Sequence, residues 1–524
     1  MKIEIAKFEK LLKRRSEFID VIYEDDEQSQ FPSEMSYYFQ QNILSYFIPS
    51  EFKGRFEHPY QTFCLGRVLA RRNLTSAIAI GQSFLGSIPV WLAGTQEQKE
   101  ALAKILSNSG ANCLALTEEK HGSDLSATEV FYDQEKEVLS GTKWCINNAT
   151  KGKALTVLAM TKQGPTLFFV KKDDISDKFF SYINKIKTHG IRGADISGII
   201  FSDLPLKEEA FVGRQARGLE IVAKTMHVSR TLCASFSLGA ADTTFRNTLD
   251  FVNRRVLYGK NLIDDKRILC LLSESFARIM ACEALSCVVS RVGTVQPEFL
   301  SLYSAVIKAY IPPLIDQQIK ICSEIMGARY YLRENDYPLF QKFLRDHAVV
   351  SLFDGSVGVN LSIIASKFNN IKHHITSEEI YDQSILNVNE KLPEFDFKRL
   401  KLSARNKDFL FSSFLRTSNK QNKGVQKIEK YRLKFLESLD GLDHKDDYQN
   451  RKLALDYCRL VSAVSYYLFL KNNKVYGQLS QESSLEYILS IIFEEKNSYH
   501  YSASFFKNFL SHKMISHFDI EVNE

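Results

Sequence analysis

The sequence predicts a mainly α-helical protein that carries a small β domain in its middle. Apolar residues recur at helical spacing over residues 1–112 and again in long segments between 217 and 370. Between them, residues 113–216 hold short β-rich runs bounded by glycine, asparagine and aspartate. A chain of 524 residues is also too long for one ordinary core. We therefore expect several domains, with a cleft where they meet.

The first domain, residues 1–112, is expected to be helical. The segments that fit helices best are 37–47, 59–72 and 96–106. The uncharged run 73–96 is long enough to raise the question of a membrane span, but its polar residues dilute its apolar character. We instead expect two buried helices that meet near residues 86–89, where a glycine and a proline stand.

The second domain, residues 113–216, is expected to be a small and largely antiparallel β structure. The third, residues 217–370, is expected to be a helical bundle, because its apolar pattern has the helical period over long stretches. These stretches are 217–254, 266–292 and 299–326. Together the two domains place strands and long helices next to each other in the chain, as in a mixed architecture.

The last domain, residues 371–524, is a predicted helical extension that begins with a polar linker. Its residues 398–434, the basic segment, hold twelve lysines and arginines and only two acidic residues. Such a segment is usually a solvated face, but it could also dock an acidic protein or an anionic membrane surface. Beyond Tyr448 the pattern becomes helical and apolar.

Charge and cysteine usage narrow the class of protein. A net charge of +6 over 524 residues argues against a dedicated nucleic-acid binder. The nine cysteines are scattered and form neither a C-x-x-C pair nor a zinc pattern with histidines, so we expect no metal site. Reduced cysteines and the lack of a visible secretory signal favour a cytoplasmic protein.

One acidic residue stands alone in the apolar stretch "SLFDGSVGVN", residues 351–360. Asp354 could cap a helix, since aspartate accepts hydrogen bonds from the first free N–H groups. It could equally be a catalytic base, because burial beside an apolar ligand raises the proton affinity of a carboxylate. Gly355 behind it would let the backbone approach a ligand closely.

Four stretches, in this order, resemble motifs of the acyl-CoA dehydrogenase family. The first two are "CLALTEEKHGSDLSAT" at 113–128 and "GTKWCINNA" at 141–149. The others are "RRVLYGKNLIDDKRI" at 254–268 and "LRDHAVVSLFDGSVGVN" at 344–360. The resemblance covers about residues 1–370 and implies that family's helical, β, helical fold, with an extra helical domain as in its longer members.

The resemblance implies FAD-dependent α,β-dehydrogenation of an acyl thioester, carried by coenzyme A or by an acyl carrier protein. Asp354 matches the position of the family's base, usually a glutamate, and would take the α-proton while a hydride leaves for flavin N5. Arg230 and Gly355 are the implied substrate contacts, although Arg230 could instead make a salt bridge between helices. An electron-transfer partner or oxygen would reoxidise the flavin, and a homodimer or tetramer is implied.

Ten positions match the family's flavin contacts: Leu116, Thr117, Ser123, Trp144, Ile146, Arg255, Tyr258, Lys266, Gly327 and Ser356. Arg255 and Tyr258 would reach the cofactor of a neighbouring subunit, although Arg255 could be a plain surface charge. Trp144 could be a core residue of the β domain. Lys266 and Glu324 stand where the family has glutamine, and Ser356 replaces a threonine.

Two alternatives to the dehydrogenase remain open. The aspartate in place of glutamate and the altered flavin contacts would suit a catalytically impaired relative with a binding or scaffold role. Aspartate at the base position also occurs in nitroalkane oxidases of the same superfamily, so a flavin oxidase of that kind is the second alternative.

Overall fold

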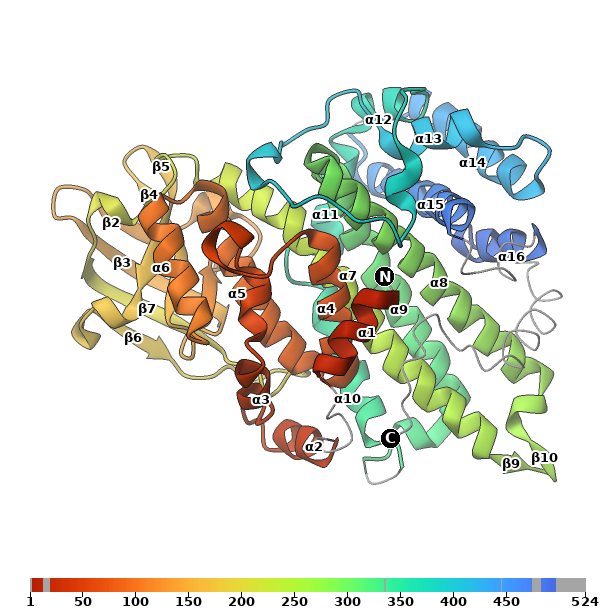
Figure 1. The fold of residues 1–524 in the computed structure, drawn as a ribbon, viewed down its shortest axis with the longest axis horizontal. Coiled ribbons are helices and arrows are strands. Elements are labelled where there is room, and N and C mark those ends of the chain that lie inside the picture. Colours follow the sequence, from red (N-terminus) through yellow and green to blue (C-terminus); the bar gives the residue numbers. More distant parts are fainter. Residues whose placement is uncertain (1, 13–18, 334–335, 444, 474–481, 496–524) are drawn as a thin grey trace.

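A computed structural model of the chain describes residues 2–12, 19–333, 336–443, 445–473 and 482–495. It confirms a mainly helical protein with a β domain in the middle of the sequence. In Figure 1 the β domain lies at the left, the N-terminal helices lie beside it, and the long helices of residues 218–326 cross to the right. The C-terminal helices cover the upper right of the molecule.

The N-terminal part is built from six α-helices in its described residues. They are α1 (Lys2–Leu11), α2 (Ile19–Glu27), α3 (Met35–Gln40), α4 (Pro59–Arg72), α5 (Leu74–Ala93) and α6 (Gln96–Ser107). The predictions for 59–72 and 96–106 are confirmed, whereas 37–47 is split into α3 and a 3-10 helix at Ile43–Phe47. Asn42, in the left-handed conformation with φ 53°, separates the two.

The prediction of two helices in 73–96 is wrong, because this run forms the single helix α5 with Pro89 inside it. Gly86 serves close packing instead of a break. A Cβ atom at Gly86 would lie 2.6 Å from the backbone carbonyl carbon of Cys113. The Gly86 carbonyl also accepts a hydrogen bond from Thr156 Oγ1 at 2.8 Å. The glycine therefore lets the β domain approach the helix.

The β domain has one sheet with the strand order β6-β7-β3-β2-β4-β5-β8, and β1 pairs with β4. Its strands are β1 (Asn112–Ala115), β2 (Phe131–Asp133), β3 (Val138–Asn147), β4 (Ala154–Thr161), β5 (Gly164–Lys171), β6 (Phe180–Ile183), β7 (Ile196–Pro205) and β8 (Phe211–Val212). Only the β1–β4 and β2–β4 pairs are parallel within the described sheet. The largely antiparallel prediction is thus confirmed, and the short strands β6 and β8 were not foreseen.

Three long helices form the bundle, and two shorter helices follow them. They are α7 (Gly218–Arg254), α8 (Lys266–Val295), α9 (Leu300–Met326), α10 (Pro338–His347) and α11 (Val357–Ala365). Between α7 and α8 the strands β9 (Val256–Leu257) and β10 (Lys260–Asn261) form an exposed hairpin, visible at the lower right of Figure 1. The predictions for the three long helices are confirmed to within a few residues.

The extension packs on the bundle. Its described helices are α12 (Phe368–His374), α13 (Phe409–Thr417), α14 (Lys423–Asp440), α15 (Asp447–Asn472) and α16 (Glu482–Ile492). Helix α15 contacts α8, α9 and α11, and its apolar residues join the core of the bundle. Helices α5 and α15 are long and apolar enough to cross a membrane, but 89% and 78% of their apolar windows are buried inside the protein. Such burial is typical of core helices.

Candidate active site

Asp354 lies on the short loop that leads into α11. Ser356 is the N-cap of this helix, and its Oγ accepts a hydrogen bond from the Val359 N–H at 3.3 Å. The hypothesis that Asp354 caps the helix is therefore wrong. Its side chain instead lies against α7, where the Cys233 thiol donates to its Oδ2 across 3.4 Å.

Two more side chains hold the backbone of this loop. Arg230 on α7 donates from Nε to the Asp354 carbonyl at 3.1 Å. Asn360 on α11 donates from Nδ2 to the carbonyls of Gly355 and Ser356, at 2.8 and 2.9 Å. Asp354 and Gly355 both have left-handed backbone conformations, with φ values of 55° and 85°. The loop thus adopts a conformation that external contacts must maintain.

Gly355 cannot carry a side chain without displacing these contacts. A Cβ atom there would lie 3.1 Å from Asn360 Nδ2 and 3.3 Å from Arg230 Nη2. The glycine therefore lets a buried guanidinium and an amide approach the loop from two sides.

Arg230 is a buried cation next to the carboxylate. Burial lowers the pKa of Arg230 to about 10, although the charges of Asp354 and Cys233 act to raise it. Burial also raises the pKa of the Cys233 thiol well above its usual range, and Asp354 adds to this effect. Cys233 therefore stays a protonated thiol, and its S–H donates a hydrogen bond to Asp354 Oδ2.

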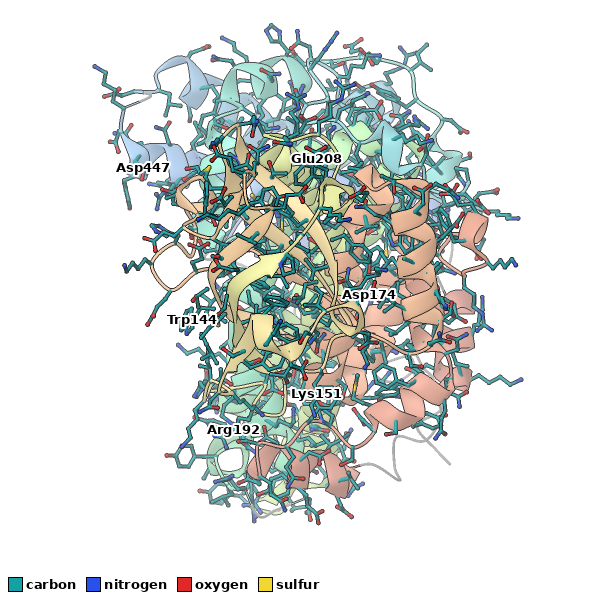
Figure 2. The ribbon with its side chains drawn as sticks, turned by 90° about the vertical axis from the view of Figure 1, so that its left-hand side faces the viewer. Trp144, Lys151, Asp174, Arg192, Glu208 and Asp447 are labelled. Atoms are coloured by element: carbon teal, nitrogen blue, oxygen red, sulfur yellow. The ribbon has the colours of Figure 1, made fainter. Side chains whose placement is uncertain are left out.

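A second group of predicted residues meets where β1 ends beside β3. The Trp144 N–H donates to the Thr117 carbonyl at 2.9 Å, and Lys143 Nζ donates to the Leu116 carbonyl at 2.9 Å. Trp144 is half-buried and lies near the edge of the sheet domain in Figure 2. Its neighbour Cys145 has φ 59° within a bulge of β3. The bulge changes the direction of the strand at this point.

Ile146 and Ser123 differ in what they can offer a ligand. The Ile146 side chain belongs to the buried core of the β domain, so only its backbone could contact a cofactor. Ser123 is exposed on the loop between β1 and β2.

The loop that carries Ser123 is held by Glu118 and Lys143, a buried ion pair that sequence reasoning missed. Lys143 Nζ lies 2.7 Å from Glu118 Oε1, and Glu118 also accepts from the backbone N–H groups of Glu129 and Val130. Burial acts to raise the pKa of Glu118, but the hydrogen bonds from Lys143, Thr128 and the backbone lower it to about 2. Glu118 lies in the stretch "TEE" and Lys143 in the stretch "GTKW", both within the motifs quoted above, so the motifs could have drawn attention to this ion pair.

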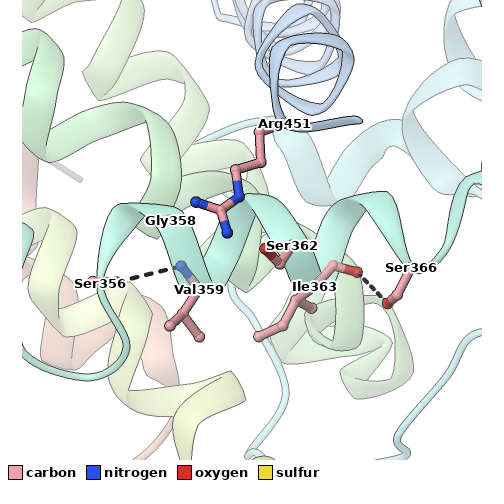
Figure 3. Close-up of a pocket in the computed structure, with 7 residues that line it drawn as sticks. All are labelled: Ser356, Gly358, Val359, Ser362, Ile363, Ser366 and Arg451. Carbon is pink, nitrogen blue, oxygen red and sulfur yellow. Dashed lines mark hydrogen bonds between the residues drawn. The ribbon is translucent and has the colours of Figure 1, made fainter. Parts of the chain in front are cut away.

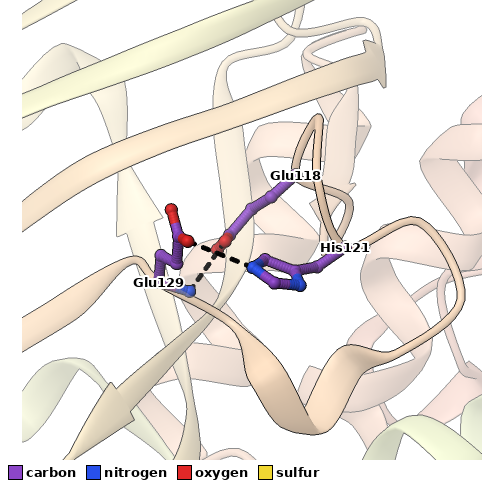
Figure 4. A group of neighbouring side chains, drawn as sticks. All are labelled: Glu118, His121 and Glu129. Carbon is purple, nitrogen blue, oxygen red and sulfur yellow. Dashed lines mark hydrogen bonds and ion pairs between the residues drawn. The ribbon is translucent and has the colours of Figure 1, made fainter.

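Glu118 also belongs to a group of side chains with His121 and Glu129, drawn in Figure 4. His121 Nε2 lies 3.2 Å from Glu129 Oε1. Because Glu118 is already engaged by Lys143, Thr128 and two backbone N–H groups, the cluster is accounted for as a support of this loop.

Four predicted residues lie at the far end of the bundle: Arg255, Tyr258, Lys266 and Gly327. Arg255, the residue that caps the C-terminal end of α7, follows Arg230 by 25 positions, which corresponds to a rise of about 37 Å. Tyr258, at the tip of the β9–β10 hairpin, is 102% exposed. Glu324 beside this end pairs with Arg267 at 3.4 Å. One copy of the chain therefore does not bring these residues to Asp354.

A groove between α11 and α15 continues from the Asp354 loop, with a volume of about 480 Å³ (Figure 3). Its lining residues are Ser356, Gly358, Val359, Ser362, Ile363, Ser366 and Arg451. Arg451 comes from the extension and pairs with Asp447 at 2.8 Å. Its Nη1 lies 3.5 Å from the place where a Gly358 Cβ atom would stand. The predicted cofactor residue Ser356 thus lies at a groove of mixed polar and apolar lining that the extension helps to form.

Comparison with protein families gives two matches that follow each other along the chain. Residues 113–204 match the middle domain of acyl-CoA dehydrogenase, and residues 216–368 match its C-terminal domain. A probable acyl-CoA dehydrogenase of Mycobacterium tuberculosis is 22% identical over 64% of this chain and 86% of its own length. The acryloyl-CoA reductase (NADH) of Anaerotignum propionicum is 24% identical over 61% of this chain and 82% of its own length.

Solved structures share the fold. An acyl-CoA dehydrogenase of Bacillus anthracis, complexed with FAD, has a TM-score of 0.74 at 16% identity and covers 98% of this chain and 88% of that one. The prolyl acyl carrier protein oxidase AnaB has a TM-score of 0.62 at 18% identity and covers 70% of this chain and 98% of that one. The first of these includes a counterpart of the extension.

Proposed function

Because the chain belongs to the acyl-CoA dehydrogenase family, we propose that it is an FAD-dependent oxidoreductase that introduces an α,β double bond into an acyl thioester. The observation that carries the proposal is the support given to Asp354. Asp354 stands on a strained loop and is held at two points by residues of α7: Arg230 binds its backbone carbonyl, and Cys233 binds one oxygen of its carboxylate. Such fixation is what a general base needs and a surface aspartate does not.

The residues present suit FAD. Exposed or half-buried hydroxyl groups at Thr117, Ser123 and Ser356, with the exposed guanidinium of Arg255, are donors appropriate to a flavin and its phosphates. The half-buried indole of Trp144 would cover one face of the ring. When bound, FAD would supply the acceptor for the hydride at its N5.

The protein residues would supply proton transfer and orientation. Asp354 would take the proton from the carbon next to the thioester carbonyl, and Cys233 would restrict the carboxylate to one orientation by donating to Oδ2. Arg230 would fix the loop and place positive charge beside the thioester. The missing side chain of Gly355 would leave room for close approach of the substrate.

We further propose that a second copy of the chain completes the cofactor site, in a homodimer or tetramer. The support is the distance from Asp354 along α7 to its C-terminal end, where Arg255 is exposed and Tyr258 stands fully exposed on the hairpin that follows. A cytoplasmic location is proposed on the scattered cysteines.

The carrier of the acyl group is proposed to be an acidic acyl carrier protein that docks on the basic segment. Exposed lysines there support this docking: Lys398, Lys401, Lys407, Lys420, Lys430 and Lys434. The similar structure named as a prolyl acyl carrier protein oxidase supports the same substrate class. If so, flavin reduction by an acyl carrier protein thioester weakens as salt is raised, because salt screens the attraction between opposite charges on which this docking depends.

Bleaching of the flavin absorbance tests the reaction. The purified protein is expected to be yellow and to lose its flavin band on anaerobic mixing with an acyl-CoA or acyl carrier protein panel. Asp354→Asn should keep the colour and slow the bleaching by about 100- to 10,000-fold, the range of general-base catalysis. Glu437→Gln, an exposed carboxylate on α14, is the matched control and should bleach as the wild type does.

The outcomes separate the alternatives. Bleaching retained in Asp354→Asn contradicts the assignment of the base. A colourless protein that cannot be reconstituted with FAD favours the binding or scaffold role. Bleaching by nitroalkanes but not by acyl thioesters favours the oxidase. Comparing the rate at which air and an electron-transferring protein reoxidise the reduced flavin identifies the electron acceptor.

A further inference from the structure

A buried ammonium group lies beneath the loop that carries Asp354. Lys308 on α9 has no exposed surface, and its Nζ donates to the carbonyl of Val350. The same Nζ lies 5.0 Å from the centre of the Phe353 ring. Both contacts fall on the four residues that precede Asp354, on the side of the loop opposite its entry into α11. The proposed reaction has so far used none of them.

The position of Lys308 is energetically unfavourable for a lysine. Burial lowers its pKa, the charges of Cys233 and Asp354 act to raise it, and Arg230 acts to lower it. Asp316, the other carboxylate near it, is engaged by His347 Nδ1 at 2.5 Å and by Ser351 Oγ at 3.1 Å. A methionine of similar length would fill this site without a desolvation penalty. Packing alone therefore does not explain why a lysine stands here, and we expect its ammonium group to have a specific structural or functional role.

Such a role would be to hold the loop that carries Asp354. Its C-terminal half is held by Arg230 and Asn360, which bond the carbonyls of Asp354, Gly355 and Ser356. Lys308 holds its N-terminal half by a charge-assisted hydrogen bond and by the face of an aromatic ring. With φ values of 55° and 85° at its centre, the loop needs anchors at both ends to keep one conformation.

We propose that Lys308 is a positioning residue, which anchors the Val350 to Phe353 stretch and thereby sets where the Asp354 carboxylate stands. The role in catalysis rests on the function proposed above, whereas the anchoring does not. Because a displacement of about 1 Å can cost on the order of 100-fold in rate, a residue that only anchors the base can matter as much as a direct contact.

Lys308→Met tests the proposal, with Lys320→Met as the matched control on the exposed face of the same helix. In Lys308→Met, amide hydrogen exchange over residues 349–356 is expected to rise about tenfold or more, because the loop opens locally more often. Flavin reduction by the best substrate should slow about 100-fold with little change in substrate affinity. Deuterium at the α-carbon should slow it further, since proton abstraction becomes limiting. Lys308→Arg should restore part of both properties.

Three results would overturn the proposal. One is unchanged hydrogen exchange over 349–356 in a folded Lys308→Met protein. Another is a loss of substrate affinity with unchanged reduction at saturation, which would make Lys308 a binding residue. The third applies if Lys308→Met does not fold. It is a folded Lys308→Arg protein in which the amides of residues 349–356 exchange as fast as those of surface loops elsewhere. If the wild type reduces no flavin, the proposed function fails, and the hydrogen exchange still decides whether Lys308 anchors the loop.

Discussion

Acid is expected to destabilise this protein in part through one buried side chain, that of His227. It lies on α7 one turn before Arg230 and is 6% exposed. Its Nδ1 is among the buried atoms of the described residues that have no hydrogen-bond partner. Burial lowers its pKa to about 3, and the charges of Arg230, Lys367 and Lys224 add to this shift. The folded protein therefore keeps this imidazole neutral at a pH where the unfolded chain protonates it.

The sign and size of the effect follow from these values. The usual pKa of 6.5 applies to the unfolded chain, so the stabilisation is complete above that pH and is lost as the pH falls from 6.5 toward about 3. At about pH 5 the loss amounts to about 2 kcal/mol, because the unfolded chain then binds a proton that the folded chain excludes. Burial also lowers the pKa of His58, to about 4, so His58 contributes in the same direction. His58 is unchanged in the variant described next, so its contribution is the same in the wild type and in that variant.

Urea unfolding at about pH 7.5 and about pH 5, followed by tryptophan fluorescence, measures the difference. His227→Gln, which cannot titrate, should lose about 2 kcal/mol less than the wild type between the two conditions. His373→Gln, an exposed histidine on α12, should behave as the wild type does. If His227→Gln loses as much stability as the wild type, the imidazole is not held neutral, and the description of the charges around Arg230 is wrong.

Two further substitutions test other parts of the structure. Gly355→Ala forces a side chain against Asn360 and Arg230 at φ 85°, so flavin reduction should slow and the protein should lose about 1–3 kcal/mol of stability in thermal unfolding. Gly441→Ala, with open space around it, is the control. Equal activities of the two variants would contradict the strain at Gly355. Asp242→Asn leaves Arg67 and Arg71 without their shared carboxylate, which lies 2.8 and 2.5 Å from them, and should destabilise the protein by about 3–5 kcal/mol in thermal unfolding. The exposed pair of Asp250 and Arg254 offers the comparison, and a loss there as large as at Asp242 would contradict the role of burial.

The fold could be predicted from the sequence where periodicity is long and uninterrupted. Helices α7, α8 and α9 begin and end within a few residues of the predicted bounds, because one repeating apolar face specifies each of them. Strands β6 and β8 have four and two residues, too few for a pattern to be visible. The predicted break in α5 failed because Gly86 looks like an interruption in the sequence, whereas it is a contact with a strand in the structure.

The candidate site could be predicted only in part, because motifs specify positions and not partners. The stretch around Asp354 singled out the carboxylate, but only the position of Ser356 Oγ in the structure excluded the helix cap, and the role of Asp354 as the base stays a prediction. Cys233 lies three residues after Arg230, so it shares a helix face with a predicted residue and could have been found by that spacing. Lys308 comes from a segment with no motif, 46 positions away from Asp354, and only the folded structure brings the two together.

The extension helps to hold the loop of Asp354, although no motif connects the two. Asp354 precedes α11, so the direction of the loop depends on how α11 is held. Helix α11 packs on α9 on one side and on α15 of the extension on another, and Arg451 of α15 reaches over its first turn at Gly358. Since α15 shares one apolar core with the bundle, α11 is held between the helix that carries Lys308 and a helix of the extension. The extension is thus part of the scaffold that fixes the Asp354 loop, and the basic segment lies on this same extension.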